Sequence, residues 1–389
     1  MIHYVLDFIG FILILKWIKL QFKDYKNFQK KSDYFSLKRF QTILITLIIV
    51  ALPILIVNLT SVEVVNHLSK ETIASNKHWY AIVVSFFISF IWLIYVIKLD
   101  VFNKEKKRNI LFVIILACIS TSLAEYPYQF VHRLGLVDSV QPVQSFIYSV
   151  FGIGLVEEII KLIPLLIVLK FTKAIDEPYD YILYASCSAL GFAFVENAMY
   201  LSDYGLEIIN ARALYATVAH MTFSSMIAYG LFLVKYKKTK FPAVLVFLAF
   251  FFFAIFSHGF YDFWLMNKAV SKFTGLTTLF FLVTVHIWFA MKNNTINVSN
   301  YYDKSKIVNN DGLKIYLSIG LLSIFMFSYL YVSFAWNSKQ GNLFLIKSAL
   351  VYGYIIFYLV ATLSKFDLIK GFIKPFKLNF RHLIPRKKK

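Results

Sequence analysis

The chain is a succession of long apolar runs separated by short polar segments. A helix needs about 20 apolar residues to cross the hydrocarbon core of a bilayer. Ten runs reach this length, near 41–61, 79–98, 109–125, 143–169, 181–201, 211–234, 242–266, 273–291, 314–335 and 344–364. Residues 2–18 are an eleventh candidate, but Asp7 and Lys16 weaken it. This segment could instead be an amphipathic helix lying on the membrane surface or an uncleaved signal-like segment. The pattern therefore predicts an all-α, polytopic integral membrane protein with ten or eleven transmembrane helices.

Composition supports the same class. Hydrophobic residues make up 59% of the chain and charged residues 16%, whereas soluble domains carry about 45–50% and about 25%. Much of the apolar surface must therefore face the lipid bilayer. The net charge of +20 would suggest nucleic-acid binding in a soluble protein, but the basic residues lie in short loops between apolar runs. We expect no nucleic-acid partner.

The basic residues follow an alternating pattern that predicts the orientation in the membrane. Segments 16–39, 98–108 and 235–240 and the C-terminal tail are rich in lysine and arginine, whereas the loop 62–78 is poor in them. Positively charged loops tend to stay in the cytoplasm, so both ends of the ten-span block are predicted to be cytoplasmic. Lysine-rich, arginine-poor usage favours a bacterial source. We predict a multi-pass protein of the cell membrane.

Ionisable side chains inside a membrane helix are costly and usually mark a functional site. Four consecutive spans contain such polar residues: Glu157, Glu158 and Lys161 in the first, Glu196 and Asn197 in the second, Arg212 and His220 in the third, and His258 and Asp262 in the fourth. Counted from the basic loops at about 1.5 Å per residue, Glu157, Glu196, His220 and His258 all lie about 20–24 Å from the cytoplasmic face. This shared depth predicts one site, nearer the extracytoplasmic surface.

Two imidazoles and several carboxylates at one level are suitable ligands for Zn²⁺. A catalytic zinc keeps one position for water, and a nearby carboxylate can accept that water's proton. We predict His220, His258 and Glu196 as metal ligands. Glu157 and Glu158 are adjacent, and either one could be the general base.

The remaining polar residues are predicted to support this site. Lys161 would keep one of the paired glutamates ionised, and Asp262 would assist His258 or the transition state. Glu196 could instead pair with Lys161 or Arg212. Asn197 could donate to a developing oxyanion, or form an ordinary interhelical hydrogen bond. Arg212 could neutralise the acidic residues, bind substrate or anchor its helix at the interface.

Three short motifs occur in order, each within an apolar span: EExxK at Glu157–Lys161, FxxxE at Phe192–Glu196 and HxxxD at His258–Asp262. Together they resemble the PrsW family of intramembrane proteases, which are distant relatives of the type II CAAX prenyl endopeptidases. The resemblance covers residues 143–266. It divides the chain into an N-terminal membrane region (1–142), a catalytic four-helix core (143–266) and a C-terminal membrane region with a basic tail (267–389).

The resemblance implies a glutamate-dependent metalloprotease that cleaves a membrane-anchored protein near its extracytoplasmic side, typically an anti-sigma factor. The CAAX-type enzymes carry histidine where this chain has Glu196, which disfavours a prenylated substrate. Two alternatives remain open at this level. An ion- or proton-coupled transporter also uses intramembrane ionisable residues, but the chain shows no repeated halves. A catalytically silent scaffold would not need the EExxK motif that the chain retains.

Overall fold

The structure is a computed structural model that describes residues 12, 37–59, 76–237, 241–307 and 310–376. These residues form helices and no strand. The α-helices are α3 (Leu37–Leu59), α5 (Lys77–Leu99), α6 (Lys107–Ser122), α7 (Glu125–Arg133), α8 (Pro142–Ile147), α9 (Leu155–Phe171), α10 (Pro178–Tyr204), α11 (Ile209–Ala211), α12 (Thr217–Tyr236), α13 (Ala243–Met266), α14 (Gly275–Asn297), α15 (Asn310–Ala335) and α16 (Ser338–Leu363). Two π-helical segments, η1 (Tyr148–Gly154) and η3 (Arg212–Ala216), precede α9 and α12, and three short 3₁₀ segments are η2 (Leu206–Ile208), η4 (Lys268–Phe273) and η5 (Lys304–Lys306).

Within the described residues, eight helices are long and apolar enough to cross a membrane. They correspond to eight of the ten predicted runs. The other two runs are also helical: α3, and the continuous α8–η1–α9 segment that carries the paired glutamates. The predicted all-α, polytopic membrane protein is therefore confirmed. The proposed span at residues 2–18 lies outside the described residues, apart from Ile12.

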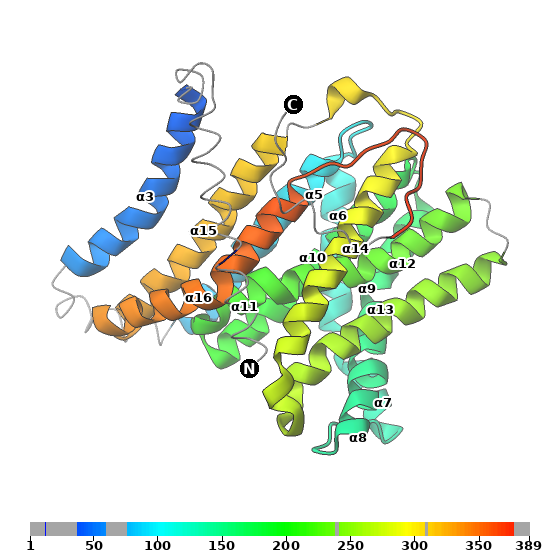
Figure 1. Cartoon of the computed structure of the whole chain (residues 1–389). Helices are drawn as coiled ribbons and strands as arrows, with labels where there is room; N and C mark the ends of the chain where they lie inside the picture. Colours follow the sequence, from blue (N-terminus) through cyan, green and yellow to red (C-terminus); the bar gives the residue numbers. More distant parts are fainter. Residues whose placement is uncertain (1–11, 13–36, 60–75, 238–240, 308–309, 377–389) are drawn as a thin grey trace.

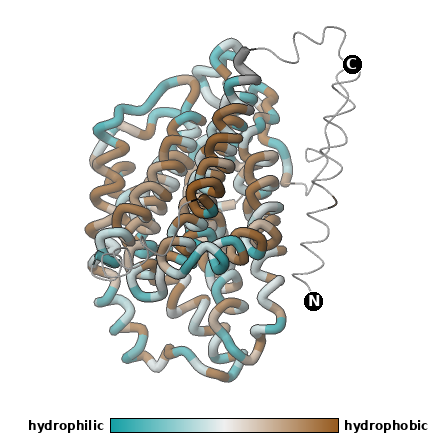
Figure 2. Tube along the Cα trace, turned by 90° about the vertical axis from the view of Figure 1, so that its left-hand side faces the viewer, coloured by the Kyte–Doolittle hydropathy of each residue, from teal (hydrophilic) through white to brown (hydrophobic). Residues whose placement is uncertain are grey.

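The helices are arranged around α10 and α12. In the span that contains α12, 83% of the most apolar stretch is buried inside the protein. The corresponding fraction is 72% for α10 and only 28% for α13. Helix α10 packs against α5, α6, α9, α12 and α14, while α3, α15 and α16 lie on one side of the molecule (Figure 1). Figure 2 shows long hydrophobic stretches on the helices and hydrophilic residues at many of the turns that join them. The outer helices thus present apolar surface to lipid.

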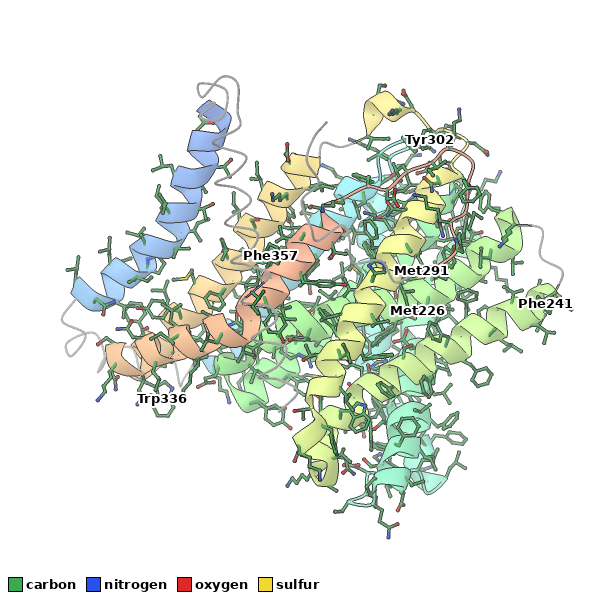
Figure 3. The ribbon with its side chains drawn as sticks, viewed as in Figure 1. Met226, Phe241, Met291, Tyr302, Trp336 and Phe357 are labelled. Carbon is green, nitrogen blue, oxygen red and sulfur yellow. The ribbon has the colours of Figure 1, made fainter. Side chains whose placement is uncertain are left out.

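Side chains fill the spaces between the central helices. Figure 3 shows Met226 of α12 and Met291 of α14 in the interior, where both are fully buried. Phe241 and Trp336 lie at the periphery and are 70% and 56% exposed. Exposed aromatic residues at helix ends are typical of the membrane–water interface.

The segment 364–376 follows α16 and is held against the end of α14 by polar contacts. The side chains of Asn293, Asn294 and Asn297 bond backbone groups of this segment at 2.7–3.2 Å. The Lys292 ammonium donates to the carbonyl of Lys365 at 2.6 Å. Three consecutive polar residues and one further along α14 therefore have an architectural role, because they satisfy the polar groups of an irregular stretch of backbone.

Candidate metal and catalytic site

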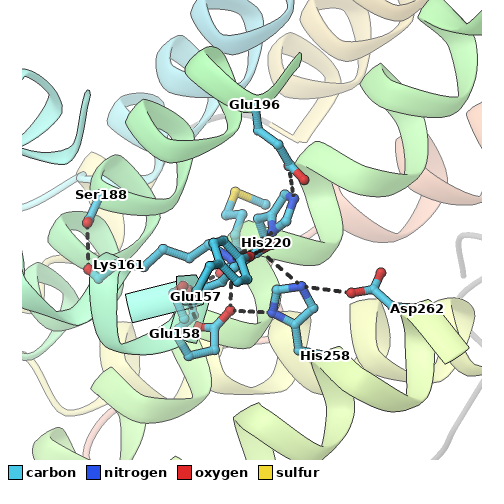
Figure 4. A network of polar contacts seen from close by, with 12 residues as sticks. Glu157, Glu158, Lys161, Ser188, Glu196, His220, His258 and Asp262 are labelled. Atoms are coloured by element: carbon cyan, nitrogen blue, oxygen red, sulfur yellow. Dashed lines mark hydrogen bonds and ion pairs between the residues drawn. The ribbon is translucent and has the colours of Figure 1, made fainter. Parts of the chain in front are cut away.

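The structure joins all nine predicted site residues in one polar network. Figure 4 shows seven of them, namely Glu157, Glu158, Lys161, Glu196, His220, His258 and Asp262. Helix α9 supplies Glu157, Glu158 and Lys161, α10 supplies Glu196 and Asn197, η3 and α12 supply Arg212 and His220, and α13 supplies His258 and Asp262. The convergence predicted from a shared depth is confirmed.

Lys161 is at the centre of this network. Its ammonium lies 3.1 Å from Glu157 Oε2, 3.0 Å from Glu158 Oε1 and 2.8 Å from His220 Nδ1. It also stacks over the Phe192 ring at 4.1 Å. The spacing of three and four residues along α9 lets one lysine reach both glutamates. Lys161 therefore balances both carboxylates of the pair, where the sequence suggested only one.

The two histidines are oriented in the same way. His258 directs Nε2 toward Glu157 Oε2 at 3.4 Å, and its Nδ1 is 2.9 Å from Glu158 Oε1. His220 directs Nδ1 toward Glu157 Oε2 at 3.9 Å, and its Nε2 is 2.7 Å from Glu196 Oε2. In metal sites, a histidine commonly binds the metal through one nitrogen and a carboxylate through the other. Each ring has a carboxylate on one nitrogen and Glu157 Oε2 within 3.4–3.9 Å of the other. The nitrogen that faces Glu157 also has a second neighbour, which is the Lys161 ammonium for His220 and Asp262 for His258.

Three of these residues fit a metal ion. One ligand atom each of Glu157, His220 and His258 lie within 4.8 Å of one another, and all three residues are buried. Two imidazoles and one carboxylate are a donor set used by catalytic zinc. This grouping differs from the predicted ligand set at one position, because it contains Glu157 where the sequence suggested Glu196.

Glu196 is bound by other groups. Its Oε2 lies 2.6 Å from Nη2 of Arg212, whose Nε donates to Asn197 Oδ1 at 2.6 Å. The Arg212 guanidinium also stacks on the Tyr200 ring at 4.3 Å, and the Asn197 amide donates to Thr217 Oγ1 at 3.0 Å. Of the alternatives for these residues, the structure shows the Glu196–Arg212 ion pair and the interhelical bond of Asn197.

Two residues that were not predicted donate hydrogen bonds to the paired glutamates. The hydroxyl of Tyr128 on α7 donates to Glu157 Oε1 at 2.9 Å, and that of Ser224 on α12 donates to Glu158 Oε2 at 2.8 Å. Ser224 lies one helical turn after His220, a spacing that could have identified it. Tyr128 precedes the predicted core at 143–266, and no sequence pattern connects it with Glu157.

A short amphipathic helix brings Tyr128 to the site. Val131 of α7 is buried against Val156 and Ile160 of α9 and Phe192 of α10. Apolar packing on this face leaves α7 beside the glutamate pair, so Glu157 contacts α7 on one side and the two histidines on the other.

Comparisons with known proteins point to one family. A family model described as "PrsW family intramembrane metalloprotease" matches residues 105–291. The "Protease PrsW" of Oceanobacillus iheyensis is 32% identical over 187 residues, which are 47% of this chain and 83% of that protein. The "Protease PrsW" of Clostridioides difficile is 32% identical over 178 residues, covering 42% and 68%. That of Geobacillus kaustophilus is 34% identical over 117 residues, covering 30% and 50%.

The fold, the buried site and these relatives define an intramembrane peptidase. The chain belongs to the PrsW family. The match extends beyond the predicted core on both sides and includes α7 and Tyr128. These three relatives are bacterial, as expected from the lysine-rich composition. No solved structure matches the chain significantly.

Proposed function

We propose that the protein is a metal-dependent endopeptidase that cleaves a membrane-anchored protein near its extracytoplasmic side. The arrangement of the two histidines carries this proposal. Each comes from a different helix, each directs one ring nitrogen toward Glu157, and each has its other nitrogen bound by a carboxylate. A histidine needed only for packing would not require both features.

His220, His258 and Glu157 are the residues that would hold the metal, and their donor chemistry favours Zn²⁺. When bound, the metal supplies a Lewis acid that polarises the scissile carbonyl and makes water a stronger acid. Glu196 and Glu158 orient the two imidazoles, and Lys161 balances the negative charge.

Glu157 is the reactive carboxylate of the pair. Its Oε2 faces both histidines, and its Oε1 accepts the Tyr128 hydroxyl. Glu158 is fully buried and contacts Lys161, His258 and Ser224. These contacts leave Glu157 as the carboxylate able to complete the metal site or to accept a proton from water.

Asp262 supports the substrate side of the site. Its side chain is 20% exposed, and its Oδ2 lies 3.3 Å from His258 Nε2. An entering peptide would therefore meet the Asp262 carboxylate as it approaches His258. An anti-sigma factor, the substrate implied by the family resemblance, would make this reaction a step of regulated intramembrane proteolysis.

The test uses the full-length protein, reconstituted in nanodiscs with a single-span anti-sigma factor. We expect about one zinc per chain in the wild type. The variant His258→Ala should lose that metal and lower cleavage by roughly 10³-fold or more. The matched control is His286→Ala, which removes a buried histidine of α14 that lies outside the network. Equal metal and cleavage in His258→Ala and the control would contradict the proposal.

Glu157→Gln separates the two roles of that residue. Loss of cleavage with zinc retained identifies Glu157 as the proton acceptor, whereas loss of both identifies it as a ligand. Normal cleavage by Glu157→Gln excludes both roles. A well-folded wild type that binds no metal and cleaves no substrate would instead favour the transporter or the scaffold hypothesis.

A further inference from the structure

A second group of acidic side chains lies at the opposite end of α10. Asp100 and Glu105 follow α5, Asp176 and Glu177 precede α10, and Asp180 is in its first turn. Asp180 is sixteen residues before Glu196, so the two lie about 24 Å apart along the helix. One oxygen each of Asp100, Glu177 and Asp180 lie within 4.8 Å of one another, and all three side chains are buried. The cluster lies beside the basic loop 98–108 and therefore on the predicted cytoplasmic side.

In Asp100 and Asp180, only one of the two carboxylate oxygens takes part in helix capping or turn formation. Oδ2 of Asp180 accepts the backbone N–H groups of Asp176 and Glu177 at 2.9 and 2.7 Å. Oδ2 of Asp100 accepts the N–H of Glu105 at 2.7 Å. The other oxygen, Oδ1, is buried in each residue and has no hydrogen-bond partner. Leaving a buried acceptor unsatisfied is costly, and native structures rarely do so without a reason.

Protein cations do not compensate this charge. In the described parts of the chain, none of the five carboxylates has a lysine, arginine or histidine nitrogen within 4.0 Å, although the chain carries a net charge of +20. Neutral donors serve the outer part of the cluster, where Tyr184 donates to Glu105 at 2.5 Å and Ser299 to Glu177 at 2.9 Å. An added cation would offset the cost of burying these carboxylates together.

We propose that Asp100, Glu177 and Asp180 form a second cation site, which binds a hard divalent ion of the Mg²⁺ and Ca²⁺ class. Its donors are all oxygen atoms, which suit Mg²⁺ and Ca²⁺, and it lacks the histidine or cysteine that favours zinc. The buried Oδ1 atoms of Asp100 and Asp180, which have no hydrogen-bond partner, would coordinate such an ion.

The bound ion would hold together the cytoplasmic ends of α5 and α10, and α14 would be joined to them through Glu177. Asp100 ends α5, and Glu177 and Asp180 begin α10. Ser299, which donates to Glu177, follows α14. All three helices lie against one another or against α12, which carries His220. The ion is therefore expected to stabilise the bundle without taking part in cleavage.

The experiment titrates full-length, chelator-stripped protein in detergent with Mn²⁺ and follows free Mn²⁺ by electron paramagnetic resonance. We expect saturable binding that is competed by Mg²⁺ or Ca²⁺, and a higher temperature of unfolding when either ion is added. Asp100→Asn and Asp180→Asn should weaken Mn²⁺ binding by more than roughly 10-fold, the least expected when a metal site loses a supporting group.

Two controls separate this site from the proposed zinc site. Asp203→Asn makes the same charge change at an exposed position near the other end of α10 and should bind Mn²⁺ like the wild type. His258→Ala should also retain this binding, even though it removes a proposed zinc ligand. Absence of saturable binding in folded wild type, or loss of binding in His258→Ala, overturns the proposal. If Asp180→Asn loses its helix cap and does not fold, Asp100→Asn and the wild-type titration decide the question.

Discussion

Lys161 shows how one residue makes the glutamate pair compatible with a membrane interior. Its ammonium is fully buried and contacts both glutamates. Removing one partner of a buried ion pair is strongly destabilising, because it leaves an uncompensated charge. The EExxK spacing is therefore an electrostatic unit. Lysine at the fifth position reaches both carboxylates only because three and four residues are one turn of a helix.

The Tyr128 hydroxyl provides a residue-scale prediction. Tyr128→Phe removes the donor to Glu157 Oε1 and leaves the ring in place. We expect kcat/KM for cleavage to fall by roughly 10- to 100-fold, the usual effect of losing an outer partner of a metal-site residue, with the zinc content unchanged. Tyr126→Phe is the matched control, because Tyr126 lies on the same helix and is 71% exposed. Equal rates in both variants would refute a role for the hydroxyl.

At the scale of elements, both π-helical segments lie directly before helices that carry site residues. Segment η1 leads into α9 and its glutamates, and η3 leads into α12 and His220. Such segments are rare and often occur at functional sites. Segment η1 packs closely on α13, where Gly259 has no side chain to separate the helices. A Cβ atom at Gly259 would contact Val150 N at 2.6 Å and Ser149 C at 2.7 Å.

Gly259→Ala is the corresponding prediction. The added methyl group must push α13 away from η1 and displace the neighbouring His258. Overpacking of this kind costs about 1–3 kcal/mol, so we expect a lower temperature of unfolding and a reduced zinc content.

Gly312→Ala supplies the control, because Gly312 lies in helix α15 and no atom of the described residues lies within 4 Å of an added Cβ. Alanine is the better helix former by about 1 kcal/mol, so this variant should be at least as stable as the wild type. Equal unfolding temperatures for the two variants would show that the α13–η1 contact adapts without cost.

At the scale of the whole molecule, the positive-inside pattern predicts which loops face the cytoplasm. The η4 connection between α13 and α14 should be extracytoplasmic, whereas the η5 connection before α15 should be cytoplasmic. Ser271 and Ser305 are exposed residues of these two segments. The orientation decides whether the proposed proteolytic site faces outward and the acidic cluster inward.

A membrane-impermeant maleimide applied to intact cells tests this orientation. Ser271→Cys should be labelled and Ser305→Cys should react only after the cells are opened. The unsubstituted protein reports any labelling of Cys118 and Cys187. Labelling of Ser305→Cys in intact cells, with Ser271→Cys protected, would reverse the predicted topology.

Hydropathy and helical spacing determine much of this protein without reference to its tertiary structure. Apolar runs of sufficient length have few alternatives in lipid, because a helix satisfies its own backbone. The ten helical runs, the shared depth of Glu157, Glu196, His220 and His258, and the pairing of Lys161 with a glutamate all follow from such local rules.

Tertiary structure decided the properties that depend on how each helix is rotated and which neighbour it meets. Depth alone does not distinguish Glu157 from Glu196 as the carboxylate facing both histidines, because both lie at one level. The contact with Tyr128 depends on the packing of α7 against α9 and α10. The acidic cluster joins Asp100 to Asp180 across eighty residues, and only the approach of α5 to α10 brings them together. Local patterns set what each helix carries, and interhelical packing sets which of those groups meet.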